Sequence, residues 1–212
     1  GRRGRQWLSP KNAGIYISLV RLFEVNADAL QALSLVTALS LRQALAKLGI
    51  NDLSLKWPND ILHHKKKLAG ILLELQQSAD HCHVVFGVGI NIALPEGAIE
   101  KIDRAVTDIA AICKEQDPTS SIPDSNRIIA ELVNEMSANL EKYLDQGFVP
   151  FQALWNQADC YLDCDIVIEN SSSRTIGKSL GVDESGGLIL QSANGTKSVH
   201  GGEIFPSVHE LP

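Results

Sequence analysis

The chain has 212 residues, a hydrophobic content of 44% and a formal net charge of −6, from 19 basic and 25 acidic side chains. A chain of this length can bury a full core, most simply as one globular domain or one domain with a small appendage. The acidic balance excludes a general affinity for nucleic acid, so any anion site must be local. Neither a run of about 18 apolar residues nor a signal peptide is present, which predicts a soluble cytoplasmic protein with no membrane role.

The first seven residues read GRRGRQW and place two glycines and three arginines within five positions. Glycine lets the backbone approach a ligand closely, and guanidinium groups bind phosphate or carboxylate with paired donors. The segment therefore predicts a phosphate-binding loop. The alternative is a solvated basic tail, but Trp7 argues against it because such tails rarely carry an aromatic residue. The abrupt start, without Met, indicates that upstream sequence is missing.

Strand and helix patterns alternate over the next fifty residues. Residues 14–22 alternate apolar and polar side chains, which predicts a strand with one face against a core. Residues 28–48 repeat apolar side chains at three- and four-residue steps and end before Gly49, which predicts an amphipathic helix. Residues 53–57 return to a strand pattern, so the order is strand, helix, strand.

Two apolar runs, residues 53–55 and 68–75, flank a turn-prone Pro-Asn-Asp and a basic tip that reads HHKKK. This pattern predicts two neighbouring strands joined by a loop. If both runs lie in one sheet, the Asn59 amide, the Asp60 carboxylate and the Lys67 ammonium converge on one side of the loop. A cation beside a carboxylate and an amide suits an anionic ligand.

The β-branched run over residues 82–92 is interrupted by Gly87 and Gly89 and ends at Asn91. Glycine inside a strand marks a close approach by a ligand or by another backbone. The third glycine that opens a helix in dinucleotide-binding folds is missing, so that fold is rejected. Gly70, in the preceding predicted strand, is equally consistent with close packing and with close ligand approach.

Histidines and cysteines give only weak metal signals. The pairs His63/His64 and His81/His83 lie on polar loop tips, where imidazoles are more often solvated than bound to metal. The four cysteines lack the paired spacing of a zinc site and are expected to be reduced structural thiols.

The second half contains three more helix patterns, over residues 103–114, 124–144 and 148–155. From about residue 159, short strands alternate with turn signals such as Asn-Gly at positions 194 and 195, which predicts a small β-barrel. Roughly fifty residues are marginal for an independent core, so this barrel is expected to dock on the larger part.

Five motifs occur in the order and spacing of one protein family: RRGRQW, KWPND, KLAGILLEL, GVGIN and GVDESGGLILQ followed by GGEI. With these motifs the whole chain resembles the bacterial biotin protein ligases, also called biotin–[acetyl-CoA-carboxylase] ligases. The resemblance implies an α+β fold. Residues 1–158 would form a mixed-sheet catalytic domain of the class II aminoacyl-tRNA synthetase type, incomplete at its N-terminus, and residues 159–212 an SH3-like β-barrel.

The resemblance implies a two-step reaction. The carboxylate of biotin attacks the α-phosphate of ATP, giving biotinoyl-5′-AMP and pyrophosphate, with Mg²⁺ assisting. A lysine of a biotin carboxyl carrier domain then attacks the mixed anhydride. Because two anions meet in the first step, positioned cations supply much of the catalysis.

Residue roles follow from the same resemblance. Lys67 matches the family's active-site lysine and would lie between the biotin carboxylate and the α-phosphate. Arg2 matches the arginine of the loop that closes over the adenylate, with Arg3 and Arg5 as phosphate or loop-ordering partners. The full set of expected biotin and adenylate contacts is Gly1, Arg2, Arg3, Arg5, Trp7, Asn59, Asp60, Lys67, Gly70, Gly87, Gly89 and Asn91.

Within that set, Trp7 would wall the pocket and the Asn59 amide would orient phosphate. Asp60 would hold Mg²⁺ or position the incoming lysine. Gly87 and Gly89 would let the adenylate lie against the strand, and Asn91 would donate a hydrogen bond to it.

The chain enters the family's glycine-arginine motif only at its third residue, so biotin binding by this sequence alone is expected to be impaired. DNA binding is expected only if a helix-turn-helix precedes residue 1, and a homodimer through sheet edges is a further expectation. Two alternatives remain: a lipoate or octanoate ligase on the related fold, which KWPND argues against, and a truncated binding module without catalysis.

Overall fold

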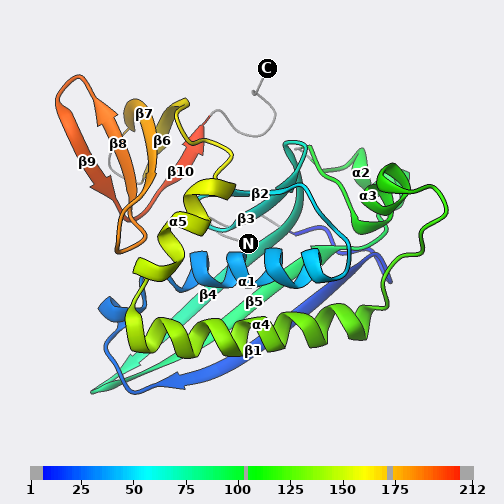
Figure 1. The fold of residues 1–212 in the computed structure, drawn as a ribbon, viewed down its shortest axis with the longest axis horizontal. Coiled ribbons are helices and arrows are strands. Elements are labelled where there is room, and N and C mark those ends of the chain that lie inside the picture. The colour runs from blue at the N-terminus through cyan, green and yellow to red at the C-terminus, as the bar shows by residue number, and fades with distance from the viewer. Residues whose placement is uncertain (1–6, 103–104, 171–173, 206–212) are drawn as a thin grey trace.

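The computed structural model describes residues 7–102, 105–170 and 174–205. They form two five-stranded sheets with helices packed against the first (Figure 1). The first sheet has the strand order β1-β5-β4-β3-β2, and every ladder in it is antiparallel. Its strands are β1 (Gly14–Phe23), β2 (Leu53–Lys56), β3 (Asp60–His63), β4 (Lys66–Ser78) and β5 (His81–Asn91).

Helices α1 (Leu33–Lys47) and α4 (Ser125–Gln146) lie side by side over one face of this sheet (Figure 1). The predicted start of α4 is confirmed, because the Asp124 side chain accepts hydrogen bonds from the Asn126 and Arg127 amides as the N-cap. Its predicted apolar stripe is also confirmed, since all five members are buried: Ile128, Leu132, Met136, Leu140 and Tyr143.

The segment that contains α1 is apolar almost all round. A short 3₁₀ helix (Ala27–Leu30) precedes it, and residues 27–47 are long and apolar enough, by length and composition alone, to cross a membrane. In this fold, 67% of the apolar 18-residue window within this segment is buried. Helix α1 has this composition because it packs on β3 and β4 and against both α4 and α5 (Val149–Ala158), which buries ten of its 15 residues.

The region after β5 differs from the prediction. The helix expected over residues 103–114 is α3 (Ile109–Gln116), which starts at the N-cap Asp108; a short α2 (Glu96–Ile99) precedes it. Val106 instead forms an isolated parallel bridge with Lys67. This bridge and the one between Leu55 and Asp159 are the parallel pairings among the described residues, so the α+β fold is confirmed with parallel pairing confined to two points.

The second sheet has the order β10-β6-β7-β8-β9. Its strands are antiparallel neighbours: β6 (Asp165–Glu169), β7 (Arg174–Val182), β8 (Leu188–Ser192), β9 (Gly195–Val199) and β10 (Glu203–Phe205). The hairpin predicted at Asn194-Gly195 joins β8 to β9, with Gly195 at φ 104°. The prediction missed β10, which is only three residues long.

Helix α5 (Val149–Ala158) and the segment after it connect the two sheets. Trp57 Nε1 donates to Gly186 O at 3.2 Å, and Asn156 Oδ1 accepts from the Val182 amide at 2.8 Å. The Cys160 amide donates to Leu55 O at 2.9 Å. The second sheet is therefore docked on the first through hydrogen bonds that involve β2, α5 and the β7–β8 turn.

Asp159 lies within this junction. Its Oδ1 accepts from the Tyr161 amide at 2.9 Å, whereas its buried Oδ2 has no hydrogen-bond partner among the described residues. Burial raises the pKa of this carboxyl from 3.8 to about 6, because a charged oxygen without a partner is poorly solvated.

The raised pKa of Asp159 predicts a pH-dependent stability. Between about pH 4 and pH 6 the folded protein binds the proton that the unfolded chain has lost, so the free energy of unfolding falls as pH rises. Asp159→Asn should raise the free energy of unfolding at pH 8 by roughly 1–3 kcal/mol and change it little at pH 4. Urea unfolding at both pH values measures this.

The exposed Asp165 on β6 provides the control, since Asp165→Asn should behave like the parent protein at both pH values. If Asp159→Asn changed the free energy of unfolding equally at pH 4 and pH 8, the raised pKa of Asp159 would be contradicted.

Candidate active site

One row of residues crosses the first sheet on the face opposite the helices. In the strand register Tyr16 pairs with Gly89, Gly89 with Gly70, Gly70 with Asp60, and Asp60 with Lys56. Residues directly opposite one another on neighbouring strands share a face. The adjacent row, from Ile15 to Leu55, lies in the core. The structure thus brings glycines and charged residues predicted from separate motifs into one line.

The two glycines of this row form a flat floor under Trp7. A Cβ at Gly70 would lie 2.9 Å from Trp7 Cζ3, and a Cβ at Gly89 would lie 3.1 Å from Trp7 Cζ2. The Trp7 ring meets Tyr16 edge-on, with 6.5 Å between ring centroids. Its buried Nε1 has no hydrogen-bond partner among the described residues. Glycine at both positions is required for the indole to rest on the sheet.

A β-bulge turns Lys67 onto this face. Ile61 pairs with Ala69 but Leu62 pairs with Lys67, so Leu68 is an extra residue in β4. In a regular strand, positions 67 and 70 would point to opposite faces. Because of the bulge, Lys67 Nζ instead lies 3.0 Å from the point that a Gly70 Cβ would occupy.

The Lys67 ammonium is paired and largely enclosed. Nζ lies 2.6 Å from Asp60 Oδ1, and the two side chains are 10% and 15% exposed. Nζ also lies 5.2 Å from the centroid of the Trp7 ring, where a cation is attracted to the ring face. The predicted meeting of Asp60 and Lys67 is therefore present in the structure.

The backbone of Lys67 is held by the segment before α3. Its amide donates to Ala105 O at 2.9 Å, and its carbonyl accepts from the Thr107 amide at 3.0 Å. Asn91 Nδ2 donates to Thr107 O at 3.0 Å and to Lys67 O at 3.4 Å. The buried Asn91 amide nitrogen thus donates within the protein, where a donation to a ligand was expected; direct ligand contact by Asn91 stays a prediction.

Asn59 also has a backbone partner. Its Nδ2 donates to Ile71 O at 2.8 Å, and its carbonyl accepts from the Ile71 amide at 2.9 Å. These two bonds tie the segment after the cis Trp57–Pro58 peptide to β4. In the structure Asn59 therefore positions the neighbouring Asp60, and the predicted contact of its amide with phosphate is left for experiment.

Lys56 is a second cation near Asp60 that the sequence interpretation did not include among the site residues. It is 7% exposed, and its Nζ lies 5.5 Å from the centroid of the Tyr161 ring. Burial lowers the pKa of Lys56, while the Asp60 charge opposes that shift. The sequence feature that could have indicated a role for Lys56 is its position in the KWPND motif, at the end of a strand. Lys56 and Lys67 thus both lie near the Asp60 carboxylate, and the Glu203 charge also acts on Lys56.

The remaining predicted residues divide into two groups. Gly87 lies two residues before Gly89 on β5, opposite Leu72. A Cβ at Gly87 would approach Leu72 O at 3.2 Å, so its role includes close strand packing. The other group lies outside the described residues, and its predicted ligand contacts are untested: Gly1, Arg2, Arg3 and Arg5.

Comparisons with known proteins identify the family. The sequence model of the Biotin/lipoate A/B protein ligase family matches residues 1–91, and that of the Biotin protein ligase C terminal domain matches residues 168–205. A biotin–[acetyl-CoA-carboxylase] ligase of Paracoccus denitrificans is 32% identical over 211 residues, covering 97% of this chain and 85% of the relative. The chain belongs to the biotin protein ligase family.

Other biotin protein ligases agree with this membership. The Bifunctional ligase/repressor BirA of Escherichia coli is 33% identical over 205 residues, which are 96% of this chain. The chain spans 62% of the length of that relative. A solved biotin protein ligase from Aquifex aeolicus, in complex with biotin and ATP, superposes with a TM-score of 0.77 at 30% identity and covers 96% of this chain and 82% of its own.

The glycine floor gives a direct test of the site geometry. Gly70→Ala should push the Trp7 ring off the sheet, because the new methyl group would lie 2.9 Å from a ring carbon. We expect a loss of roughly 1–3 kcal/mol in the free energy of unfolding and a change in the aromatic circular dichroism signal. Urea unfolding and near-ultraviolet spectra measure both.

Gly97 in α2 is the matched control, because a Cβ there would meet no atom within 4 Å. Gly97→Ala should be neutral or slightly stabilising. If Gly70→Ala resembled Gly97→Ala in both measurements, the indole would not rest on Gly70.

Proposed function

We propose that this protein is an ATP-dependent ligase that activates biotin as biotinoyl-5′-AMP and transfers it to a lysine of a biotin carboxyl carrier protein. The observation that carries the proposal is the enclosed Lys67–Asp60 pair on a glycine floor covered by Trp7. Family membership adds the reaction class, since a solved relative is in complex with biotin and ATP. The site is built to receive an anion against a flat sheet surface.

In the first step, a carboxylate oxygen of biotin forms a bond to the α-phosphorus of ATP, and the bond to the departing pyrophosphate breaks. Both reactants are anions, so their approach costs electrostatic energy unless a cation lies between them. Lys67 supplies that cation in this proposal. Because its backbone is held by Ala105 and Thr107, the ammonium needs little reorganisation before reaction.

In the second step, the amine of the acceptor lysine attacks the acyl carbon, AMP leaves with the bonding electrons, and the amine loses a proton. Lys67 can continue to neutralise the phosphate of the departing AMP. The carrier protein would therefore approach the face of the first sheet that carries Gly89, Gly70 and Asp60.

Asp60 fits an orienting role better than a metal-binding role. Its Oδ1 is already 2.6 Å from the Lys67 ammonium, so a divalent cation bound there would meet a like charge. Mg²⁺ is usually held by one or two carboxylates together with substrate phosphates. We therefore propose that Mg²⁺ enters with the ATP phosphates and that Asp60 holds Lys67 in place; a direct bond from Asp60 to Mg²⁺ stays a prediction.

The other site residues are proposed in supporting roles. Trp7, which covers Gly70 and Gly89 in the structure, would wall the pocket. Contact of the adenylate with these two glycines stays a prediction. The arginines of the first segment, Arg2, Arg3 and Arg5, would close over the phosphate, with Gly1 giving the backbone its freedom. Catalytic roles are proposed for Lys67 and Arg2.

The organisation of the chain supports several coarser proposals. Residues 1–158 would form the catalytic domain and residues 159–212 an SH3-like β-barrel docked on it, in a soluble cytoplasmic enzyme. The biotin carboxyl carrier domain of acetyl-CoA carboxylase is the proposed partner, because the Paracoccus denitrificans relative is named for that carboxylase. A homodimer, and DNA binding through a preceding helix-turn-helix, remain expectations.

Replacement of Lys67 tests the chemistry. In the full-length protein, Lys67→Ala should lower biotin-dependent exchange of pyrophosphate into ATP by about 10²–10³-fold, because the charge between the two anions is lost. The matched control is the exposed Lys66 next to it, and Lys66→Ala should retain activity within about twofold. Equal activity of the two variants would show that Lys67 has no part in the reaction.

The same exchange assay separates biotin from lipoate and octanoate. Exchange that depends on biotin and does not respond to lipoate is the expected result. Exchange with lipoate or octanoate alone would favour the related ligase, and the absence of exchange with every acid would favour a binding module without catalysis.

A further inference from the structure

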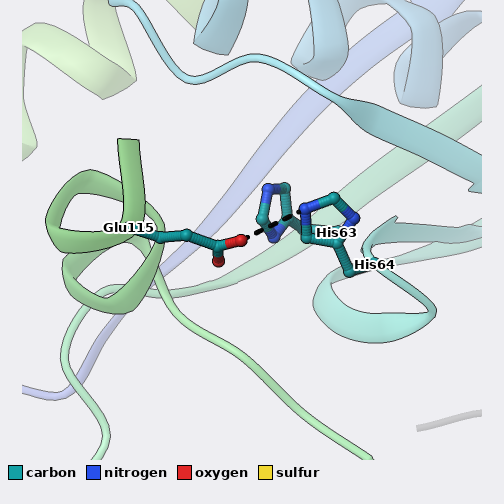
Figure 2. Close-up of side chains that lie close together, drawn as sticks. All are labelled: His63, His64 and Glu115. Carbon is teal, nitrogen blue, oxygen red and sulfur yellow. Dashed lines mark ion pairs between the residues drawn. The ribbon is translucent and has the colours of Figure 1, made fainter. Parts of the chain in front are cut away.

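A cluster of two imidazoles and one carboxylate lies outside the proposed active site (Figure 2). His63 ends β3, His64 lies in the β3–β4 turn, and Glu115 lies near the end of α3. The three side chains come from two separate parts of the chain and point toward one another in Figure 2. Their potential ligand atoms all lie within 4.8 Å of one another.

The turn explains why two consecutive histidines share a side. Neighbouring residues of a regular strand point to opposite faces. Here His64 and Lys65 have φ values of 45° and 64°, the left-handed region used in the tightest hairpin turns. The His63 and His64 rings consequently lie with centroids only 4.1 Å apart.

His63 does not fit the expectation that the histidines of this tip are solvated. The residue is 3% exposed, and none of the described residues forms a hydrogen bond with its ring. The ring instead lies beside a second imidazole and a carboxylate, and all three are groups that ligate transition metals.

The spacing suits a metal ion. His64 Nε2 and Glu115 Oε1 are 3.3 Å apart, and two ligands of a tetrahedral zinc ion, each about 2.0–2.1 Å from the metal, are themselves about 3.3 Å apart. The side chains of His64 and Glu115 are 61% and 59% exposed, so they can move to close the remaining gap. The buried His63 supplies the fixed member of the set.

We propose that His63, His64 and Glu115 form a binding site for a divalent transition-metal ion, with Zn²⁺ as the best-suited ion. Two imidazoles and one carboxylate are zinc ligands, whereas Mg²⁺ prefers oxygen ligands alone. Three protein ligands leave one position for water or an external ligand. The site is distinct from any Mg²⁺ carried by ATP.

The position of this site suggests what the ion does. It links the β3–β4 hairpin to α3, and the segment between β5 and α3 contains Ala105 and Thr107, which hold the Lys67 backbone. An ion at the cluster would therefore fasten the two elements that fix Lys67. Binding should stabilise the fold without entering the chemistry.

Zn²⁺ titration of the full-length protein against a chromogenic chelator tests the proposal. We expect one ion per chain, and a loss of affinity of at least about tenfold in His64→Ala and in Glu115→Gln. Both residues are exposed, so these variants should fold. The exposed His83 on β5 is the control, and His83→Ala should bind as the parent does.

Two further measurements distinguish this site from nonspecific metal binding and from binding by a cysteine thiolate. Zn²⁺ should raise the Tm of the parent and of His83→Ala but not that of His64→Ala, because only specific binding stabilises the folded state. The Co²⁺-substituted protein should show a spectrum without thiolate charge-transfer bands. Unchanged affinity in both His64→Ala and Glu115→Gln, or a thiolate spectrum that disappears in Cys164→Ser, would overturn the site.

Discussion

The charged part of the site depends on one extra residue in β4. Leu68 has no counterpart in β3, and this bulge directs the Lys67 side chain toward Asp60 and the glycine floor. Without the bulge, Lys67 and Gly70 would point to opposite faces of the sheet. The bulge thus holds the Lys67 ammonium in a largely enclosed position. A flexible lysine side chain on a regular strand would not be held there.

The enclosed pair is better understood as a positioning device than as a source of stability. Removing two charges from water costs several kcal/mol per ion, and their attraction does not always recover that cost. The structure adds other constraints around the pair: the Trp7 ring on one side, the Asn91 bonds behind the Lys67 carbonyl and the two Asn59 bonds to β4. Asn59 and Asn91 act on the site by fixing the backbone of the charged residues.

Local patterns in the sequence were sufficient for the long elements and for the identity of the main site residues. The stripe of α4 and its Asp124 cap follow directly from helical spacing. The Asp60–Lys67 meeting is present, but the two strands predicted to be neighbours are separated by β3, which begins at Asp60. Features that depend on cross-strand register were not predictable. The bulge requires knowing the β3–β4 register, whereas the bond from the Asn91 amide to Thr107 and the burial of His63 require knowing how separate segments pack.

The docking of the second sheet bears on how the two halves move. The turn before β8 accepts a hydrogen bond from Trp57, and Cys160, in the segment that leads to β6, donates one to Leu55. Leu55 and Trp57 lie within five residues of Asp60. A rotation of the second sheet would displace the same short segment that leads into Asp60, and with it the Asp60–Lys67 pair. The second sheet is therefore mechanically connected to the Asp60–Lys67 pair, and a change in its position would reach Lys67 through this segment.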